Sequence, residues 1–99
     1  MSYEVNWTDE AKLTFNNNLK YLSEEWDLLT INKFLDRVDE VETSISQNPN
    51  LYPIYRKSDQ THKCVLNRHM TLYYRVVSST QIDFITFWNS HKNPKNLKV

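Results

Sequence analysis

The sequence contains no glycine and one cysteine, Cys64, in 99 residues. The absence of glycine excludes every glycine-dependent phosphate loop and the nucleotide-binding motifs built on one. A single cysteine excludes an internal disulfide, which fits a reducing cytoplasm, and we expect Cys64 to be a buried strand residue. No apolar run approaches the roughly 18 residues that cross a bilayer, and the start of the chain lacks a secretory signal pattern. We therefore expect a cytoplasmic protein with no membrane partner and no cofactor.

Aromatic side chains are plentiful, at 13% of the chain, and charged residues make up 24%. An aromatic content this high argues against disorder, because these side chains bury large apolar areas. The length allows one hydrophobic core but not two. We expect residues 1–99 to form a single domain.

A net charge of zero conceals a division between the two halves of the chain. Residues 1–53 hold four Lys/Arg against ten Asp/Glu, and residues 54–99 hold eight against two. One interpretation is that the basic half meets a polyanion or an acidic partner. The other is internal complementarity, with acidic helices lying beside a basic sheet.

The segment Lys63–Trp88 predicts a three-stranded antiparallel meander. Three runs rich in β-branched and aromatic residues are separated by two short polar breaks, at residues 67–69 and 78–80. Turns this short join neighbouring antiparallel strands. The middle run is apolar on both faces, with Leu72, Tyr74 and Val76 on one and Tyr73, Arg75 and Val77 on the other. Such a strand needs at least partial cover on both sides.

The residues before the meander predict one strand and two helices. Tyr3–Trp7 alternates as a half-buried strand does. Thr8 is expected to cap a first helix and Thr30 a second, which ends at Asn48-Pro49. The two apolar stripes recur at helical spacing: Ala11, Phe15, Leu19, Leu22 and Trp26 in the first, and Ile31, Phe34, Leu35, Val38, Val41 and Ile45 in the second.

These elements predict an α+β, two-layer fold in the order β-α-α-β-β-β, with a helical hairpin packed on an antiparallel meander sheet. Leu51–Asp59 is expected to be a loop, with a short extended piece at Ile54–Arg56. After Asn89 the chain is polar and basic, and Pro94 is expected to prevent regular structure nearby.

The basic half carries residue types that bind RNA or cleave it without a metal. Cleavage needs a base for the 2′-hydroxyl, cations for the charged phosphorane and an acid for the leaving oxygen. We select Arg68, Arg75, His91 and Lys92 as candidate catalytic residues. The alternative is solvated charges at a sheet edge, with the tyrosines, Tyr74 above all, packed in the core. No metal site is expected, because the three histidines lack a partner at helical spacing.

Several short motifs, in their order, resemble the RelE/ParE superfamily of toxins from bacterial type II toxin–antitoxin modules, a class associated with plasmid stabilisation. These are Trp-Thr-Asp-Glu-Ala at Trp7–Ala11, Asn-Pro-x-x-Tyr-Pro at Asn48–Pro53, Leu-Tyr-Tyr-Arg-Val at Leu72–Val76, and Phe87-Trp88 followed by Asn93-Pro94. The resemblance covers nearly the whole chain. It implies a cytoplasmic, growth-inhibiting toxin that a cognate antitoxin neutralises.

Two activities occur in this superfamily. RelE-like toxins cut messenger RNA in the ribosomal A site, and ParE-like toxins inhibit DNA gyrase. RelE-like toxins often have Tyr-Arg early in the middle strand, where this chain has Met70-Thr71, whereas Tyr73–Val76 is similar to ParE-like members. Many relatives carry an acidic residue and an arginine after Phe-Trp, where this chain has Asn89–Lys92.

The sequence therefore slightly favours a gyrase-directed toxin. The first alternative is a ribosome-dependent, metal-independent endoribonuclease that uses the basic and histidine residues of the sheet. The second is a non-toxic scaffold that only binds the antitoxin. Whether the chain is an enzyme stays open at this point.

Overall fold

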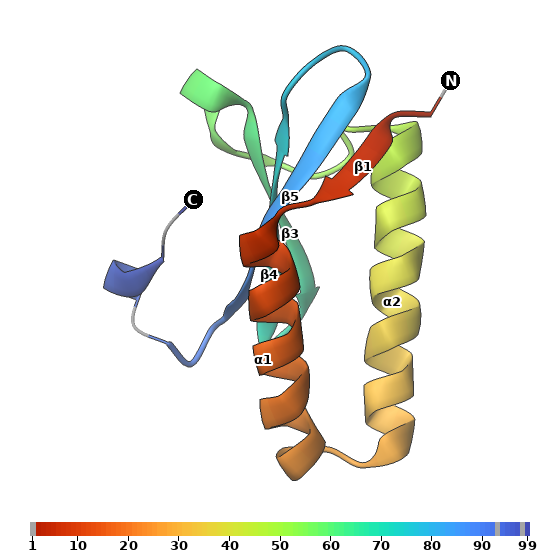
Figure 1. The fold of residues 1–99 in the computed structure, drawn as a ribbon, viewed down its shortest axis with the longest axis vertical. Coiled ribbons are helices and arrows are strands. Elements are labelled where there is room, and N and C mark those ends of the chain that lie inside the picture. The colour runs from red at the N-terminus through yellow and green to blue at the C-terminus, as the bar shows by residue number, and fades with distance from the viewer. Residues whose placement is uncertain (1, 93, 98) are drawn as a thin grey trace.

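The computed structural model describes residues 2–92, 94–97 and 99. Its elements follow the chain as β1 (Glu4–Trp7), α1 (Asp9–Glu25), α2 (Leu28–Gln47), β2 (Ile54–Arg56), the 3₁₀ helix η1 (Lys57–Asp59), β3 (Thr61–Asn67), β4 (Met70–Val76), β5 (Gln81–Asn89) and the 3₁₀ helix η2 (Pro94–Asn96). Two helices pack as a hairpin against one face of a single sheet (Figure 1). This confirms the predicted α+β, two-layer class.

The sheet has five strands in the order β1-β5-β4-β3-β2. The predicted meander is present, because β3, β4 and β5 pair antiparallel with their neighbours. Two edge strands extend it. β1 pairs parallel with β5, and the short extended piece Ile54–Arg56 pairs antiparallel with β3.

The helices cover the apolar face as the two stripes predicted. Ala11 and Leu22 of α1 and four residues of α2 are buried against the strands. From the sheet, Leu72, Tyr74 and Phe84 are fully buried on that side. Tyr74 also donates its hydroxyl to the carbonyl of Pro49 at 2.8 Å, so its polar end is satisfied inside the core. The prediction that Tyr74 packs in the core is confirmed.

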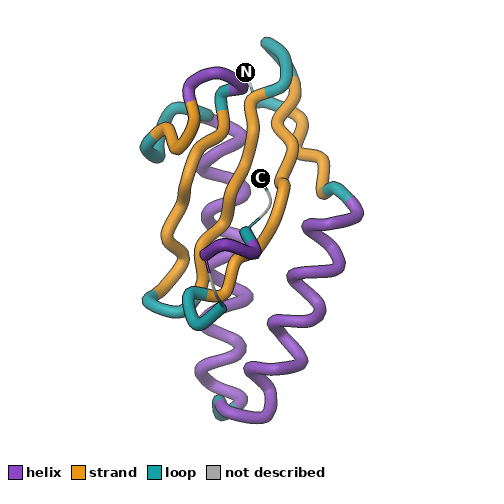
Figure 2. The backbone as a smooth tube through the Cα atoms, turned by 90° about the vertical axis from the view of Figure 1, so that its left-hand side faces the viewer, coloured by secondary structure: helices purple, strands orange, loops and turns teal. Residues whose placement is uncertain are grey.

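The opposite face of the sheet is partly covered too. Tyr73 is 4% exposed and packs edge-on against Tyr55 of β2, with ring centroids 4.9 Å apart. Figure 2 shows the C-terminal segment crossing this face, away from the helices. Pro94 begins η2, so the expectation of no regular structure there is wrong; the fixed φ of proline suits the first residue of a helical turn. Asn93, part of the family resemblance, lies outside the described residues.

One helix cap matches the sequence analysis and the other does not. Thr8 caps α1, with its hydroxyl accepting from the amide of Ala11 at 3.1 Å. The cap of α2 is Asp27 rather than Thr30, because the Asp27 carboxylate accepts from the amide of Thr30 at 2.8 Å. The helix therefore begins at Leu28, and Thr30 lies inside its first turn. The Thr30 bonds lower the pKa of Asp27.

Turns form here without glycine. Gln60, between η1 and β3, is the non-glycine residue with positive φ among the described residues, at φ 57 and ψ 39. Its amide donates to the carbonyl of Lys57 at 3.3 Å. The β3–β4 turn is held differently, because Asn67 accepts from the amides of His69 and Met70 at 2.8 and 3.0 Å.

Side chains of α1 complete the hydrogen bonds of β5 where β1 ends. β1 pairs with β5 only from Gln81 to Phe84. At that point the hydroxyl of Thr8, the N-cap of α1, donates to the Phe84 carbonyl at 2.7 Å. The amide of Phe87 donates to the Thr14 hydroxyl at 3.0 Å, and the Phe87 carbonyl accepts from the Asn18 amide at 2.8 Å. These bonds fix the first half of α1 to β5.

No helix among the described residues has the length and apolar content to cross a membrane.

We expect an Asn18→Ala variant to be less stable than wild type by about 1–3 kcal/mol, since the buried carbonyl of Phe87 loses its donor. The neighbouring, exposed Asn16 gives a matched control, and Asn16→Ala should change stability by less than about 0.5 kcal/mol. Urea unfolding followed by circular dichroism measures both. Equal stability of the two variants would contradict the role assigned to Asn18.

Candidate functional site

The candidate site lies where the β3–β4 turn meets the segment that follows β5. This is the C-terminal end of β5, whereas β1 pairs with the N-terminal end of that strand. The amide of Ser90 donates to the carbonyl of His69 at 2.9 Å, and the Ser90 hydroxyl donates to the carbonyl of Arg68 at 3.1 Å. The buried Asn89 accepts from the amide of His91 at 2.9 Å. These bonds hold the two segments together and fix the backbone of both histidines.

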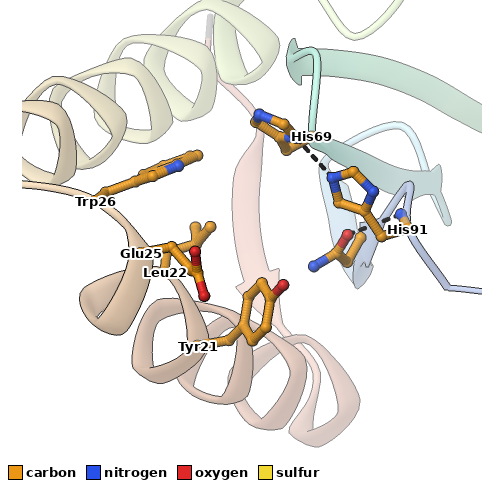
Figure 3. Close-up of a pocket in the computed structure, with 7 residues that line it drawn as sticks. Tyr21, Leu22, Glu25, Trp26, His69 and His91 are labelled. Atoms are coloured by element: carbon orange, nitrogen blue, oxygen red, sulfur yellow. Dashed lines mark hydrogen bonds between the residues drawn. The ribbon is translucent and has the colours of Figure 1, made fainter.

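The two imidazole rings face each other. Nδ1 of His69 lies 2.9 Å from Nε2 of His91, with ring centroids 5.0 Å apart. Figure 3 shows this pair opposite Tyr21, Glu25 and Trp26 of the end of α1. The Trp26 ring lies on that side, with its centroid 5.7 Å from that of His69.

Arg68 determines which nitrogen of each ring carries the proton. Its Nε–H donates to Nε2 of His69 at 3.2 Å, so Nε2 is an acceptor. A neutral imidazole has one donor and one acceptor, so the proton of His69 lies on Nδ1. Nδ1–H then donates to Nε2 of His91, whose own proton lies on Nδ1. Arg68, His69 and His91 form a hydrogen-bonded chain that runs in one direction.

Two adjoining cavities open beside the pair and share His91. The first has a volume of about 120 Å³ and is lined by Tyr21, Leu22, Glu25, Trp26, His69, Asn89 and His91. The second, of about 250 Å³, is lined by Asn17, Asn18, Tyr21, Asn89, His91 and Lys92. The hollow thus combines imidazole, carboxylate, ammonium and aromatic groups, which suit acid–base chemistry beside a stacking surface.

The structure brings together Arg68, His91 and Lys92 of the four predicted site residues, and it places Arg75 elsewhere. Arg75 lies five residues along β4 from Met70, about 17 Å at the usual rise of a strand. There its guanidinium contacts the Asp59 carboxylate at 3.2 Å and donates to the Thr61 hydroxyl at 3.1 Å. Arg75 is part of a structural ion-pair cluster, so the four residues do not form one site.

That cluster, Arg56–Asp59–Arg75, has two guanidinium groups on one carboxylate. Arg56 contacts Asp59 at 2.6 Å and also donates to the carbonyl of Val99 at 2.6 Å. The hydrogen bonds from Arg56 and Thr61 hold the pKa of Asp59 well below its usual range, outweighing the opposing effect of desolvation. Both ion pairs lie within the basic half of the sequence.

His69 and the α1 residues are the part of the site that the sequence analysis missed. In the sequence His69 is one of three histidines without a partner at helical spacing, and the spacing of Trp26 predicts only a place in the apolar stripe of the first helix. The sequence feature that could have identified His69 is its position next to Arg68 in a predicted turn, because side chains in turns are often exposed and available to bind a ligand. No sequence pattern links His69 to His91, which is 22 residues away.

The predicted role of Cys64 as a buried strand residue is confirmed. Its side chain is fully buried in β3, and burial raises the pKa of its thiol. A buried thiol of this kind is protonated at neutral pH and inaccessible, so Cys64 is not a nucleophile. Among residues 2–92, 94–97 and 99, no three His, Cys, Asp or Glu side chains gather in a way that could hold a metal ion.

A scan against protein-family models finds no match, and a search of characterised proteins finds none either.

The Asp59 cluster makes stability depend on pH. A carboxyl group whose pKa is lowered by folding stabilises the folded state above its ordinary pKa of about 4, and this contribution is lost as the pH falls below it. We therefore expect Asp59→Asn to be less stable than wild type at neutral pH, with a gap that narrows in acid. Chemical unfolding of both proteins between neutral and acid pH measures this difference in stability. A difference that does not change with pH would contradict the role of the cluster.

The hydrogen-bonded chain predicts the same tautomer for His69 and His91. Long-range proton–nitrogen NMR correlations at about pH 7.5 should show Nδ1–H in both rings. His62 is an internal reference, because its Nδ1 lies 2.8 Å from the carbonyl of Tyr52 and must donate. An Arg68→Ala variant removes the constraint on His69 only. Nε2–H on His69 in the wild type would refute the chain.

Proposed function

We propose that this chain is a growth-inhibiting toxin of RelE/ParE type that acts in the cytoplasm, is neutralised by a cognate antitoxin, and cuts RNA without a metal. The observation that carries the proposal is the Arg68–His69–His91 chain beside the cavities at the end of α1. The resemblance in sequence supports the toxin class, and this geometry favours the ribonuclease alternative over gyrase inhibition.

The substrate phosphate and His69 compete for Arg68 in this mechanism. Arg68 and Lys92 supply the cations that hold the phosphate and the charged phosphorane. When Arg68 turns to the phosphate, the proton of His69 is free to move to Nε2. Nδ1 of His69 then accepts from Nε2–H of His91, and Nδ1 of His91 presents a lone pair to the 2′-hydroxyl. His91 becomes the general base only when an anion occupies the site. It takes the 2′-hydroxyl proton as the bond from that oxygen to phosphorus forms, and water protonates the leaving 5′-oxygen as its bond to phosphorus breaks.

The aromatic side chains on the α1 side suit a nucleobase. Tyr21 is 48% exposed, and Trp26 lies beside His69. Unpaired RNA bases stack on aromatic side chains of this kind, with little preference for sequence. A stacked base next to Arg68 and Lys92 would place its own phosphate within reach of His91.

The motif that favoured gyrase inhibition has a structural explanation. In Tyr73–Val76, both tyrosines are buried, Arg75 pairs with Asp59, and Val76 packs against the core. Side chains that are buried or held in an internal ion pair present few groups to a partner, so the similarity of this motif to ParE-like toxins gives weak support for a gyrase target.

Exposed leucines on the helices support an antitoxin partner. Leu13 is 56% exposed, and Leu28 and Leu29 at the start of α2 are 72% and 64% exposed. Leu28 and Leu29 are neighbours in the sequence, and adjacent exposed apolar side chains are groups that a covering chain would bury. The same feature is what a non-toxic scaffold would require, so the growth test below separates the two.

Expression should arrest growth, and co-expression of a neighbouring antitoxin gene should restore it. In a ribosome-programmed extract, His91→Ala is expected to lower message cleavage by about 100-fold or more, the usual loss for a general acid or base. Lys57→Ala, in η1 beside β2, removes a cation away from the site and should cleave as wild type does.

Three outcomes would overturn the assignment. Cleavage at the wild-type rate by a His91→Ala, Lys92→Ala double variant would remove these residues from the chemistry. Arrest without cleavage, together with inhibited DNA supercoiling at micromolar toxin, would assign the target to gyrase. Normal growth on expression of the folded protein would favour the scaffold.

A further inference from the structure

The facing nitrogens of His69 and His91 lie at a spacing close to that of two imidazole ligands on one metal ion. They lie 2.9 Å apart, and the two rings are tilted by 32°. Two imidazole ligands of one tetrahedral ion, each bound at about 2.0–2.1 Å, stand roughly 3.3 Å apart. The two nitrogens can move apart from 2.9 Å to this separation, because His69 belongs to a turn and His91 to the segment after β5. The side chain of His91 is also exposed.

We propose that His69 and His91 form a binding site for a divalent transition-metal ion, with Nδ1 of His69 and Nε2 of His91 as its two protein ligands. The ion replaces the proton between the rings. Its effect on activity rests on the proposed function, since an ion held there occupies the nitrogens that the acid–base step uses. The binding itself rests only on the geometry of the pair.

Arg68 opposes the ion. Metal binding needs a lone pair on Nδ1 of His69, so the proton of that ring must move to Nε2. Nε2–H and the Nε–H of Arg68 are then two donors facing each other across 3.2 Å, and Arg68 has to turn away. Ion binding therefore breaks the hydrogen bond from Arg68 to His69. The positive charge of Arg68 also stays near the bound ion and repels it. Removing Arg68 should strengthen binding.

The remaining coordination positions belong to water. Among the described residues no third His, Cys, Asp or Glu completes a ligand group, although Glu25 lines the same cavity. Two imidazoles and water suit Cu²⁺ and Zn²⁺, with Cu²⁺ the tighter by the Irving–Williams order. Mg²⁺ prefers oxygen ligands and should not compete.

Calorimetric titration of the purified full chain with Cu²⁺, Zn²⁺ and Mg²⁺ tests the site in the absence of RNA. We expect one ion per chain, in the order Cu²⁺, Zn²⁺ and no measurable Mg²⁺. His69→Ala and His91→Ala should each lower the Zn²⁺ affinity by more than about tenfold. NMR fingerprints confirm that each variant is folded. Unchanged Zn²⁺ affinity in either folded histidine variant would refute the site.

Arg68→Ala and Lys92→Ala form a charge-matched pair. Each removes one positive charge beside the histidines, but only Arg68 donates to His69. Arg68→Ala should raise the Zn²⁺ affinity roughly fivefold, the worth of one net hydrogen bond. Lys92→Ala should raise it by less than about twofold, the effect of a screened surface charge. Equal gains in the two variants would refute the competition between Arg68 and the ion.

The inhibitory effect is measured separately, so its failure is distinguishable from failure of the proposed function. Saturating Zn²⁺ should lower cleavage at least about tenfold, with recovery after chelation, because an ion on Nε2 of His91 keeps the proton of that ring on Nδ1, the nitrogen that acts as the base. If cleavage requires His91 but is not lowered by saturating Zn²⁺, inhibition by the ion is refuted, whereas the metal site and the proposed function are not. Histidine-dependent Zn²⁺ binding by a protein without nuclease activity would leave the metal site standing and refute the proposed function.

Discussion

The outer edge of β5 is the constraint on which the site depends. β1 pairs with this edge only as far as Phe84, and polar side chains of α1 supply hydrogen bonds beyond it. Thr14 and Asn18 both bond to the backbone of Phe87, so the helix replaces a missing strand there. This attachment orients the last turns of α1 toward the end of β5. Tyr21, Glu25 and Trp26 face the two histidines for that reason.

Most of the fold could be predicted from the sequence because its patterns are local. The alternation of Tyr3–Trp7, the two helical stripes and the short polar breaks of the meander each report on neighbouring residues. The parallel pairing of β1 with β5 could not be predicted, since it joins segments more than seventy residues apart. An irregular register in β5 was also hidden: Tyr73 pairs with Thr86 and Tyr74 with Phe84, which leaves Ile85 as a bulge.

The candidate site was less accessible to sequence reasoning than the fold. Arg68, His91 and Lys92 were selected by residue type, and the structure places them at one end of the sheet. Arg75 has the same chemistry as Arg68 but contacts Asp59, and only the three-dimensional position of that carboxylate separates the two arginines. The tautomers of His69 and His91 follow from a hydrogen bond of Arg68, which no pattern of residues reveals.

The left-handed turn at Gln60 has a consequence for the unfolded chain. A glycine there would adopt this conformation freely, whereas glutamine does so at some cost in the folded state. In exchange, a chain without glycine explores fewer backbone conformations when it is denatured, so folding removes less disorder from it. The β1–β5 parallel pair closes a long loop, and the lower conformational entropy of the glycine-free denatured chain offsets part of the entropy that folding removes.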